Sequence, residues 1–112
     1  YKLVKKYLDV CDIRDMPHKN NEYDFVVAYD ILEHLQTEED VRMALKELYR
    51  VGENNFLFSI PFIGDPNLAN DPTHKIHKAK EWWVNEIMDA GFKIQKTPPN
   101  FLYIEQLIVA KK

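Results

Sequence analysis

The pattern of apolar and polar positions along the chain predicts its strands. Residues 8–13 alternate between apolar and polar and stop before Met16-Pro17, which predicts a strand followed by a loop. Residues 25–28 are apolar at successive positions, which is typical of a parallel strand buried on both faces, so we expect a buried central strand there. Further strands are predicted at 56–60, 92–95 and 101–110, bounded by Pro61 and by Pro98-Pro99.

Two segments have the spacing of amphipathic helices. The first follows Thr37, whose side chain is expected to accept a hydrogen bond from the amide of Asp40 in a capping box. Apolar residues then recur at helical spacing as far as Gly52, which predicts the helix end. The second helix is predicted at 79–90 and ends at Gly91. The residues expected to face inward from it are Trp82, Trp83, Ile87 and Met88.

Strands that alternate with helices indicate one layered α/β domain over residues 1–112. The last two strands are expected to pair antiparallel, because only a short proline turn separates them. Ligands of such sheets bind at the carboxyl ends of the strands. The residues predicted at that edge are Asp12, Ile13, Tyr29, Asp30, Ser59 and Pro61.

The composition narrows the class of protein. The 112 residues are 46% hydrophobic and 29% charged, with a net charge of -3, so no basic field is available to hold nucleic acid. No apolar run approaches the roughly 20 residues that cross a bilayer, so no membrane contact is expected. The single cysteine, Cys11, excludes an internal disulfide and favours a reducing, cytoplasmic compartment. Its place in a predicted strand indicates a small buried residue.

Several short motifs follow one another in order along the chain. They are Asp12-Ile13-Arg14-Asp15-Met16-Pro17, Tyr23-Asp24-Phe25-Val26-Val27, Ile31-Leu32-Glu33-His34-Leu35, Glu47-Leu48-Tyr49-Arg50-Val51 and Asp71-Pro72-Thr73-His74. Together they resemble the class I S-adenosylmethionine-dependent methyltransferases, especially the small-molecule type with a Leu-Glu-His turn. The resemblance implies a Rossmann-like, mostly parallel sheet with an antiparallel C-terminal strand. It also implies S-adenosylmethionine as cofactor and a small molecule as methyl acceptor.

The resemblance implies cofactor-binding roles for five residues. Asp12 and Ile13 stand where the family binds adenine, and a carboxylate suits the adenine amino group because it only accepts hydrogen bonds. Ala28, Tyr29 and Asp30 stand beside the methionine part and the sulfonium of the cofactor. The face of the Tyr29 ring is expected to stabilise the positive sulfur.

Histidines and tryptophans are the candidates for the acceptor side. His34 corresponds to the family's histidine near the acceptor, as a general base or pocket wall; alternatively, it is a helix-end residue that contacts local carbonyls. His74 and Trp82 are expected to face the substrate, with one of the two adjacent tryptophans in the core. His74 and His77 also have the spacing of metal ligands, but loop histidines are more often solvated or substrate-facing, so no metal is predicted. A metal-binding protein that uses His34, His74 and His77 is a third, weaker alternative.

The chain also departs from the family. The family's glycine-rich loop and its ribose-binding acid have no counterpart, and its strand order 3-2-1-4-5-7-6 predicts that strands 1 and 2 are missing here. The strand at 25–28 would then form an open edge, which predicts a homodimer or another strand-completing partner. We expect methyl transfer to a small molecule, with weak or absent cofactor binding by this chain alone. The alternative is a non-catalytic remnant that acts as an oligomerisation or interaction module.

Overall fold

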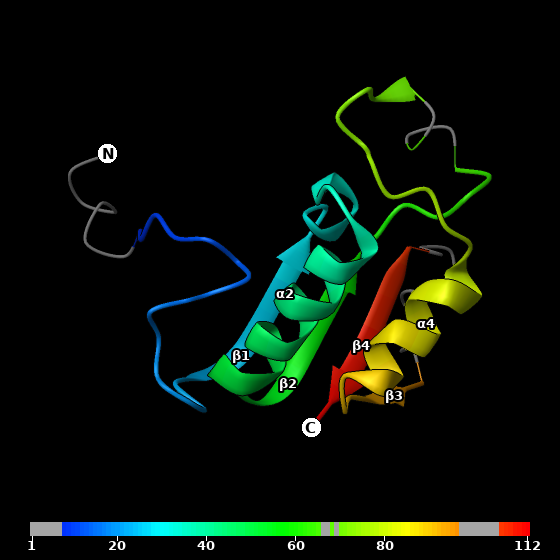
Figure 1. Ribbon diagram of the computed structural model, residues 1–112. Helices are drawn as coiled ribbons and strands as arrows, with labels where there is room; N and C mark the ends of the chain where they lie inside the picture. The colour runs from blue at the N-terminus through cyan, green and yellow to red at the C-terminus, as the bar shows by residue number, and fades with distance from the viewer. Residues whose placement is uncertain (1–7, 66–67, 69, 97–105) are drawn as a thin grey trace.

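The computed structural model describes residues 8–65, 68, 70–96 and 106–112. Its elements are β1 (Tyr23–Tyr29), the 3-10 helix η1 (Leu32–His34), α2 (Glu38–Val51), β2 (Gly52–Ser59), α4 (Lys80–Asp89), β3 (Lys93–Gln95) and β4 (Leu107–Lys111). The strands form one sheet in the order β1-β2-β4-β3 (Figure 1). The mixture of one sheet with alternating helices confirms the predicted α/β class.

Strand directions follow from the connections. β1 and β2 run parallel, because α2 carries the chain back between them. β4 is antiparallel to both β2 and β3. The predicted antiparallel pairing of the last two strands is therefore confirmed, although residues 101–105 of the longer predicted strand lie outside the described residues.

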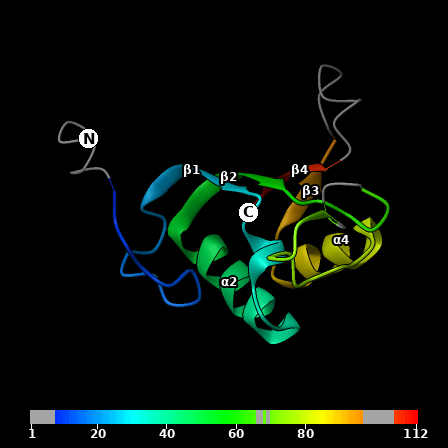
Figure 2. The same ribbon diagram turned by 90° about the horizontal axis from the view of Figure 1, so that it is seen from above.

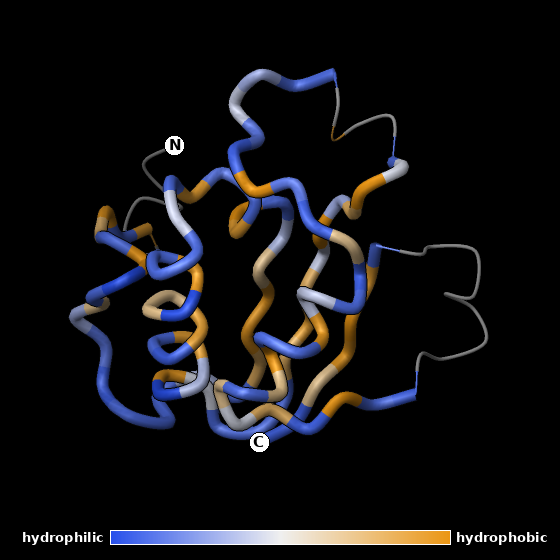
Figure 3. The backbone as a smooth tube through the Cα atoms, turned by 45° about the vertical axis from the view of Figure 1, so that its right-hand side comes forward, coloured by the Kyte–Doolittle hydropathy of each residue, from blue (hydrophilic) through white to orange (hydrophobic). Residues whose placement is uncertain are grey.

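Both helices cover the same side of the sheet (Figure 2). The strands carry the most hydrophobic stretches of the backbone, and the loops around them are largely hydrophilic (Figure 3). Phe92 lies at the centre of an aromatic cluster, with its ring 4.7 Å from Phe56, 5.1 Å from Tyr49 and 5.3 Å from Phe58, all edge to face. This geometry is favourable beyond the area it buries, and it joins the sheet to α2.

The ends of α2 are set by local chemistry, as predicted. The Thr37 hydroxyl oxygen accepts a hydrogen bond from the Asp40 amide at 3.1 Å, and acidic residues fill the first turn. The helix ends at Gly52, whose amide donates to the Leu48 carbonyl, and β2 begins at this same glycine.

The helix predicted at 79–90 is α4. Some, but not all, of the residues predicted to face inward from it are buried. Trp83 and Ile87 are fully buried, which confirms that one of the two tryptophans belongs to the core. Met88 is exposed, so its predicted inward orientation is wrong. Gly91 follows the helix with a φ of 112°, a left-handed conformation that favours glycine and ends the helix.

Residues 8–13 do not form the predicted strand, so this prediction is wrong. The segment holds only an isolated bridge between Asp12 and Asp15, and Leu8 and Cys11 are exposed, so the prediction of a buried cysteine is also wrong. Alternation alone does not make a strand, since a strand needs a neighbour to satisfy its backbone groups. Within the described chain, side chains of α2 form hydrogen bonds with the residues after this segment, Met16 and His18.

Charged side chains of α2 attach the N-terminal segment. The Met16 amide donates to the Glu47 carboxylate at 2.8 Å, and the Arg50 guanidinium donates to the carbonyls of Met16 and His18 at 2.9 and 2.7 Å. Glu47 and Arg50 also bond to each other, and this pairing lowers the pKa of Glu47. The segment therefore runs along the helix rather than along the sheet.

β1 forms one edge of the sheet, and within the described chain only β2 pairs with it. Phe25 and Val27 are 58% and 49% exposed, because they face away from the helices, so the prediction of a strand buried on both faces is wrong. The other prediction for this strand, an open edge, is confirmed.

Candidate functional site

The carboxyl end of β1 turns sharply at Asp30. Its φ is 51°, a left-handed conformation that is uncommon outside glycine and is found disproportionately at functional sites. Ser59, at the end of β2, holds the turn: the Asp30 amide donates to the Ser59 carbonyl at 2.9 Å, and the buried Ser59 hydroxyl donates to Asp30 Oδ1 at 3.1 Å. The two parallel strands thereby fix one carboxylate at their common edge.

The helix η1 follows this turn and carries Glu33 and His34. Glu33 is fully buried, and its backbone carbonyl accepts hydrogen bonds from the amides of Lys75 and Ile76 at 2.8 and 3.0 Å. These bonds bring the loop that contains His74 against η1. Two segments that are far apart in the sequence therefore share one site.

Two histidines meet where these segments touch. The rings of His34 and His74 lie 4.5 Å apart between centroids, at an interplanar angle of 64°. His34 Nδ1 lies 3.0 Å from the Thr73 carbonyl oxygen, and His74 Nδ1 lies 3.3 Å from the Leu68 carbonyl oxygen. Since a carbonyl only accepts, each neutral ring donates from Nδ1 and keeps the lone pair of Nε2.

The Glu33 carboxylate lies beside both rings. Its Oε1 is 3.7 Å from His34 Nε2 and 3.8 Å from His74 Nε2, beyond hydrogen-bonding distance, and neither carboxylate oxygen has a hydrogen-bond partner within the described chain. Burial raises the pKa of Glu33, and the negative charge of Asp30 raises it further, while the backbone amide of Glu33 itself and the nearby His34 and His74 lower it. A buried, unpaired carboxylate of this kind requires an explanation.

An open cavity of about 490 Å³ adjoins this cluster. Acidic residues and histidines dominate its lining, which consists of Asp30, His34, Asn70, Asp71, Pro72 and His74. Asp71 is fixed by the amide and hydroxyl of Thr73, at 2.9 and 2.6 Å, and its Oδ2 lies 3.4 Å from His74 Nε2. The hydrogen bonds from Thr73 lower the pKa of Asp71, which keeps its carboxylate charged at neutral pH.

The structure brings together three of the residues predicted from the sequence, since Asp30, His34 and His74 share this cavity. Ala28 is buried in the hydrophobic core, and Tyr29 is exposed on the side of β1 that faces away from the helices.

The remaining predicted residues lie elsewhere. The Asp12 carboxylate accepts hydrogen bonds from the amide, Nε and Nη2 of Arg14, which lower its pKa to about 2. Ile13 packs at the margin of the core. Trp82 is half-buried on α4, with Lys78 Nζ 5.3 Å from the centroid of its ring. These three residues do not line the cavity.

Sequence reasoning missed Glu33 as a functional residue. The Leu-Glu-His motif contains it, but nothing in the motif predicts that its side chain turns inward while its carbonyl binds the distant loop. The spacing of His74 and His77 does not make them a ligand pair, because His77 Nε2 contacts the His74 carbonyl oxygen at 2.6 Å, whereas the His74 ring packs against His34. Contacts between segments far apart in sequence were needed to find this cluster.

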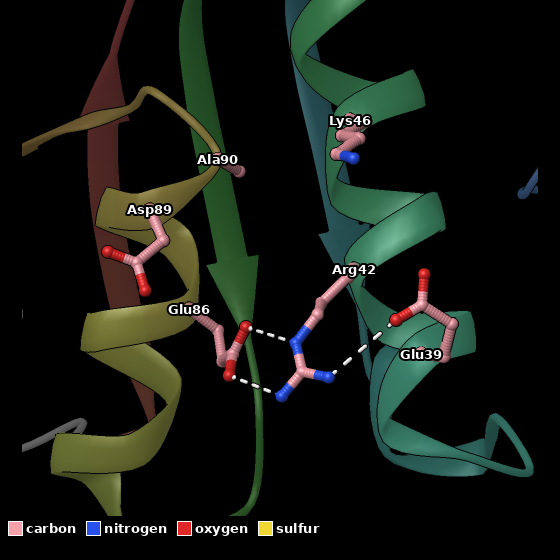
Figure 4. Close-up of a pocket in the computed structure, with 6 residues that line it drawn as sticks. All are labelled: Glu39, Arg42, Lys46, Glu86, Asp89 and Ala90. Carbon is pink, nitrogen blue, oxygen red and sulfur yellow. Dashed lines mark hydrogen bonds and ion pairs between the residues drawn. The ribbon is translucent and has the colours of Figure 1, made fainter.

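A second cavity, of about 320 Å³, lies between the outer turns of α2 and α4 (Figure 4). Arg42 crosses it with two hydrogen bonds to Glu86, both of 3.0 Å. The residues that line it are Glu39, Arg42, Lys46, Glu86, Asp89 and Ala90. This groove lies between the two helices and is occupied by a structural ion pair.

Comparison with known proteins identifies the family. A family model described as a methyltransferase domain matches residues 2–59, about half of the chain. The chain belongs to this methyltransferase domain family. The matched residues of the methyltransferase domain include β1, η1, α2 and β2, and therefore Asp30, Glu33 and His34. Among curated proteins, no relative matches the chain.

Solved structures resemble the methyltransferase domain in fold. An SAM-dependent methyltransferase from Methanosarcina mazei is 15% identical, with 93% of this chain and 66% of that chain covered and a TM-score of 0.70. An SAM-dependent methyltransferase from Archaeoglobus fulgidus is 18% identical, with 94% and 66% covered and a TM-score of 0.67. PigF with SAH is 18% identical, with 90% and 33% covered and a TM-score of 0.61.

These comparisons confirm the resemblance predicted from the sequence and, with it, S-adenosylmethionine as the cofactor of the family. The methyltransferase domain spans only part of the proteins that it resembles, from 33% of PigF to 66% of the other two. In the part of the chain that the structure describes, the helices are too short and too polar to cross a membrane.

Proposed function

We propose that this chain is part of an enzyme that transfers a methyl group from S-adenosylmethionine to a small-molecule acceptor. The observation that carries the proposal is the cavity at the carboxyl end of β1, where a left-handed aspartate and two histidines converge. Parallel α/β sheets bind their ligands at this edge. Family membership supports the reaction class, and the cavity is where we expect the acceptor to bind.

The residues at the end of β1 suit one side of the cofactor. Tyr29 offers an exposed ring, whose face attracts a sulfonium, and Asp30 offers a carboxylate that Ser59 orients and that attracts an ammonium group. The Asp12 carboxylate remains accessible to an adenine amino group, although Arg14 already engages it. We infer that Tyr29 and Asp30 contact the methionine part, with Ala28 packed beneath them and Asp12 and Ile13 on the adenine side.

When bound, the cofactor supplies an electrophilic methyl carbon on a positive sulfur. We infer that the protein contributes positioning and a proton acceptor. The Nδ1 of His34 is held by the Thr73 carbonyl, so the lone pair of Nε2 can take the proton that an acceptor hydroxyl or amine loses as its bond to the methyl carbon forms. Glu33 and Asp71 would stabilise the resulting imidazolium. His74, whose ring lies beside that of His34, is proposed to orient the acceptor, with Trp82 at a more distant rim.

Chemical-shift perturbation of the 112-residue chain by S-adenosylhomocysteine tests cofactor binding, because it detects dissociation constants in the millimolar range. We expect shifts centred on Ala28, Tyr29 and Asp30, reduced at least tenfold in apparent affinity by Asp30→Ala. The matched control Asp89→Ala, in the groove between the helices, should bind as the wild type does. Shifts confined to that groove would refute the assignment.

A second candidate function rests on the open edge of β1. Its outward backbone groups have no partner strand within the described chain, and Phe25, Val27 and Tyr29 are exposed beside them. Each ladder hydrogen bond contributes about 1 kcal/mol net, so pairing with a second copy of the chain would cover this edge. This alternative makes the chain an interaction module that dimerises through β1.

Light scattering during size exclusion distinguishes the two candidates. If β1 pairs with a second copy, the average mass should rise with concentration toward twice 13.3 kDa, and Val27→Lys should return it to the monomer value. Met88→Lys places the same charge on an exposed apolar position of α4 and should leave the mass unchanged. A monomer at every concentration would exclude the dimer without affecting the proposal of methyl transfer.

A further inference from the structure

Three potential metal ligands converge beside the cavity. One ligand atom each from Glu33, His34 and His74 can be chosen so that all three lie within 4.8 Å of one another. Glu33 Oε1 is 3.7 and 3.8 Å from the Nε2 atoms of His34 and His74. A cation bound at about 2.0–2.1 Å from each donor needs donors no more than about 4.2 Å apart, twice the bond length, and both glutamate–imidazole pairs meet this limit.

The orientation of both imidazoles suits metal binding. A carbonyl oxygen accepts from Nδ1 of each ring, Thr73 for His34 and Leu68 for His74, which leaves the Nε2 lone pair of each neutral ring available, 3.7 and 3.8 Å from Glu33 Oε1. Metal-binding histidines are characteristically held in this way, with the second ring nitrogen on a backbone carbonyl or a carboxylate. Asp71 Oδ2 lies 3.4 Å from His74 Nε2, near enough to become a fourth ligand when an ion displaces that contact.

The Glu33 carboxylate gives the strongest argument. It is fully buried, and neither of its oxygens has a hydrogen-bond partner within the described chain. A buried charge without a partner is costly unless it is neutralised or coordinates a metal. The surrounding charges make a bound cation the natural partner, because Asp30 and Asp71 line the same cavity and its described lining contains neither lysine nor arginine.

We propose that Glu33, His34 and His74 bind one divalent transition-metal ion. Two imidazoles and one carboxylate form the ligand set of many catalytic zinc sites, with a further position open to water or substrate. Glu33 closes the inner side of the site, whereas His34 and His74 border the cavity, so the open position faces the acceptor. Zn²⁺ is the ion chosen for the test, because this ligand set is common in catalytic zinc sites.

A bound ion would change the chemistry at the cavity. It occupies the lone pair of His34 Nε2, so His34 cannot then serve as the base. The ion itself would lower the pKa of an acceptor hydroxyl coordinated at the open position, and that proton would pass to solvent or to Asp71. This consequence depends on the proposed methyl transfer, but metal binding does not.

Zinc titration of the metal-stripped 112-residue chain against a chromogenic chelator tests the proposal without any cofactor. We expect one tight site per chain, with affinity reduced at least 100-fold by Glu33→Gln and by His74→Ala. Circular dichroism of each variant separates loss of the site from loss of the fold. Substitution with Co²⁺ gives a second readout, visible absorption without the intense near-ultraviolet band of a cobalt–thiolate bond.

Two control variants make the result specific. His18 and Cys11 belong to the N-terminal part of the chain and do not contact the cavity. His18→Gln and Cys11→Ser should therefore retain the full affinity for Zn²⁺. A wild-type chain that binds no zinc, or binding that is lost in these controls and retained in a folded Glu33→Gln variant, would overturn the proposal. Failure of cofactor binding in the earlier experiment would leave this result unchanged.

Discussion

Arg42 on α2 and Glu86 on α4 join the two helices by a pair of parallel hydrogen bonds, each 3.0 Å long (Figure 4). Glu86 is largely buried, and Arg42 is partly exposed. The fork of the guanidinium matches the two carboxylate oxygens, which gives this pair better geometry than most ion pairs at a surface. It connects two elements that otherwise meet through the apolar core.

We expect Arg42→Ala to destabilise the fold only slightly, because solvent screens the exposed guanidinium. A double-mutant cycle with Glu86→Ala should give a small favourable coupling energy that decreases as salt is added. Urea denaturation measures each free energy of unfolding. Lys46→Ala, in the same groove, is the control and should change stability by less than about 0.5 kcal/mol. Zero coupling between Arg42 and Glu86 would contradict this interpretation.

Gly52 is required for packing rather than for its backbone angles. Its φ of -91° suits any residue, but an added Cβ would collide with the ring of Phe56 and come within 2.9 Å of Val26 Cγ2. We expect Gly52→Ala to destabilise the protein by about 1–3 kcal/mol, as overpacked cores do. Thermal unfolding followed by circular dichroism measures the change, with Glu53→Ala at the next, exposed position as control. Equal melting temperatures for the two variants would show that the core adapts.

Local signals in the sequence predicted the elements whose determinants are themselves local. Thr37 caps α2, and Gly91 ends α4. Each of these features depends on residues a few positions apart. The predicted strand at 8–13 failed for the opposite reason, because a strand depends on a neighbour that its own pattern does not contain.

The candidate site also contains residues set by local sequence and residues set by distant contacts. Asp30 and His34 follow a predicted strand directly, and the sequence therefore located them. The burial of Glu33, by contrast, results from the loop at 71–76, whose amides reach the Glu33 carbonyl. Apolarity also misled the prediction at β1, because Phe25 and Val27 are apolar yet exposed on an edge strand. Hydrophobicity predicts which residues are favoured in the core. Whether such a residue is buried also depends on the position of its strand in the sheet.

Arg14 controls the ionisation of Asp12. Its amide, Nε and Nη2 donate four hydrogen bonds that lower the pKa of Asp12 from an ordinary 3.8 to about 2. A depressed folded-state pKa stabilises the fold above about pH 4, and this contribution is lost as the pH falls through 2. In Arg14→Gln, the Asp12 carboxyl resonance should titrate near 3.8, whereas Lys75→Gln should leave it unchanged. The same low value in Arg14→Gln would show that another group perturbs Asp12.

The ionisation of Glu33 has the opposite effect from that of Asp12: it lowers the stability of the fold as the pH rises. Its folded-state pKa is raised, first by burial, so the folded protein binds this proton more tightly than the unfolded chain does. Below the ordinary glutamate value of 4.5 both states are protonated, and the buried carboxyl imposes no charge penalty. As the pH rises above that value the unfolded state ionises first, and the stability of the wild type falls relative to a neutral variant.

Glu33→Gln should therefore match the wild type near pH 4 and exceed it near pH 8 by about 1 kcal/mol or more, because a buried amide costs less than a buried unpaired charge. Urea denaturation with a chelator present measures both free energies of unfolding, with Glu53→Gln as an exposed control. Excess Zn²⁺ at pH 8 should reverse the order, since only the wild type gains a ligand for its carboxylate. A Glu33→Gln variant that is less stable than the wild type at pH 8 without metal would mean that the carboxylate already has a partner in the fold.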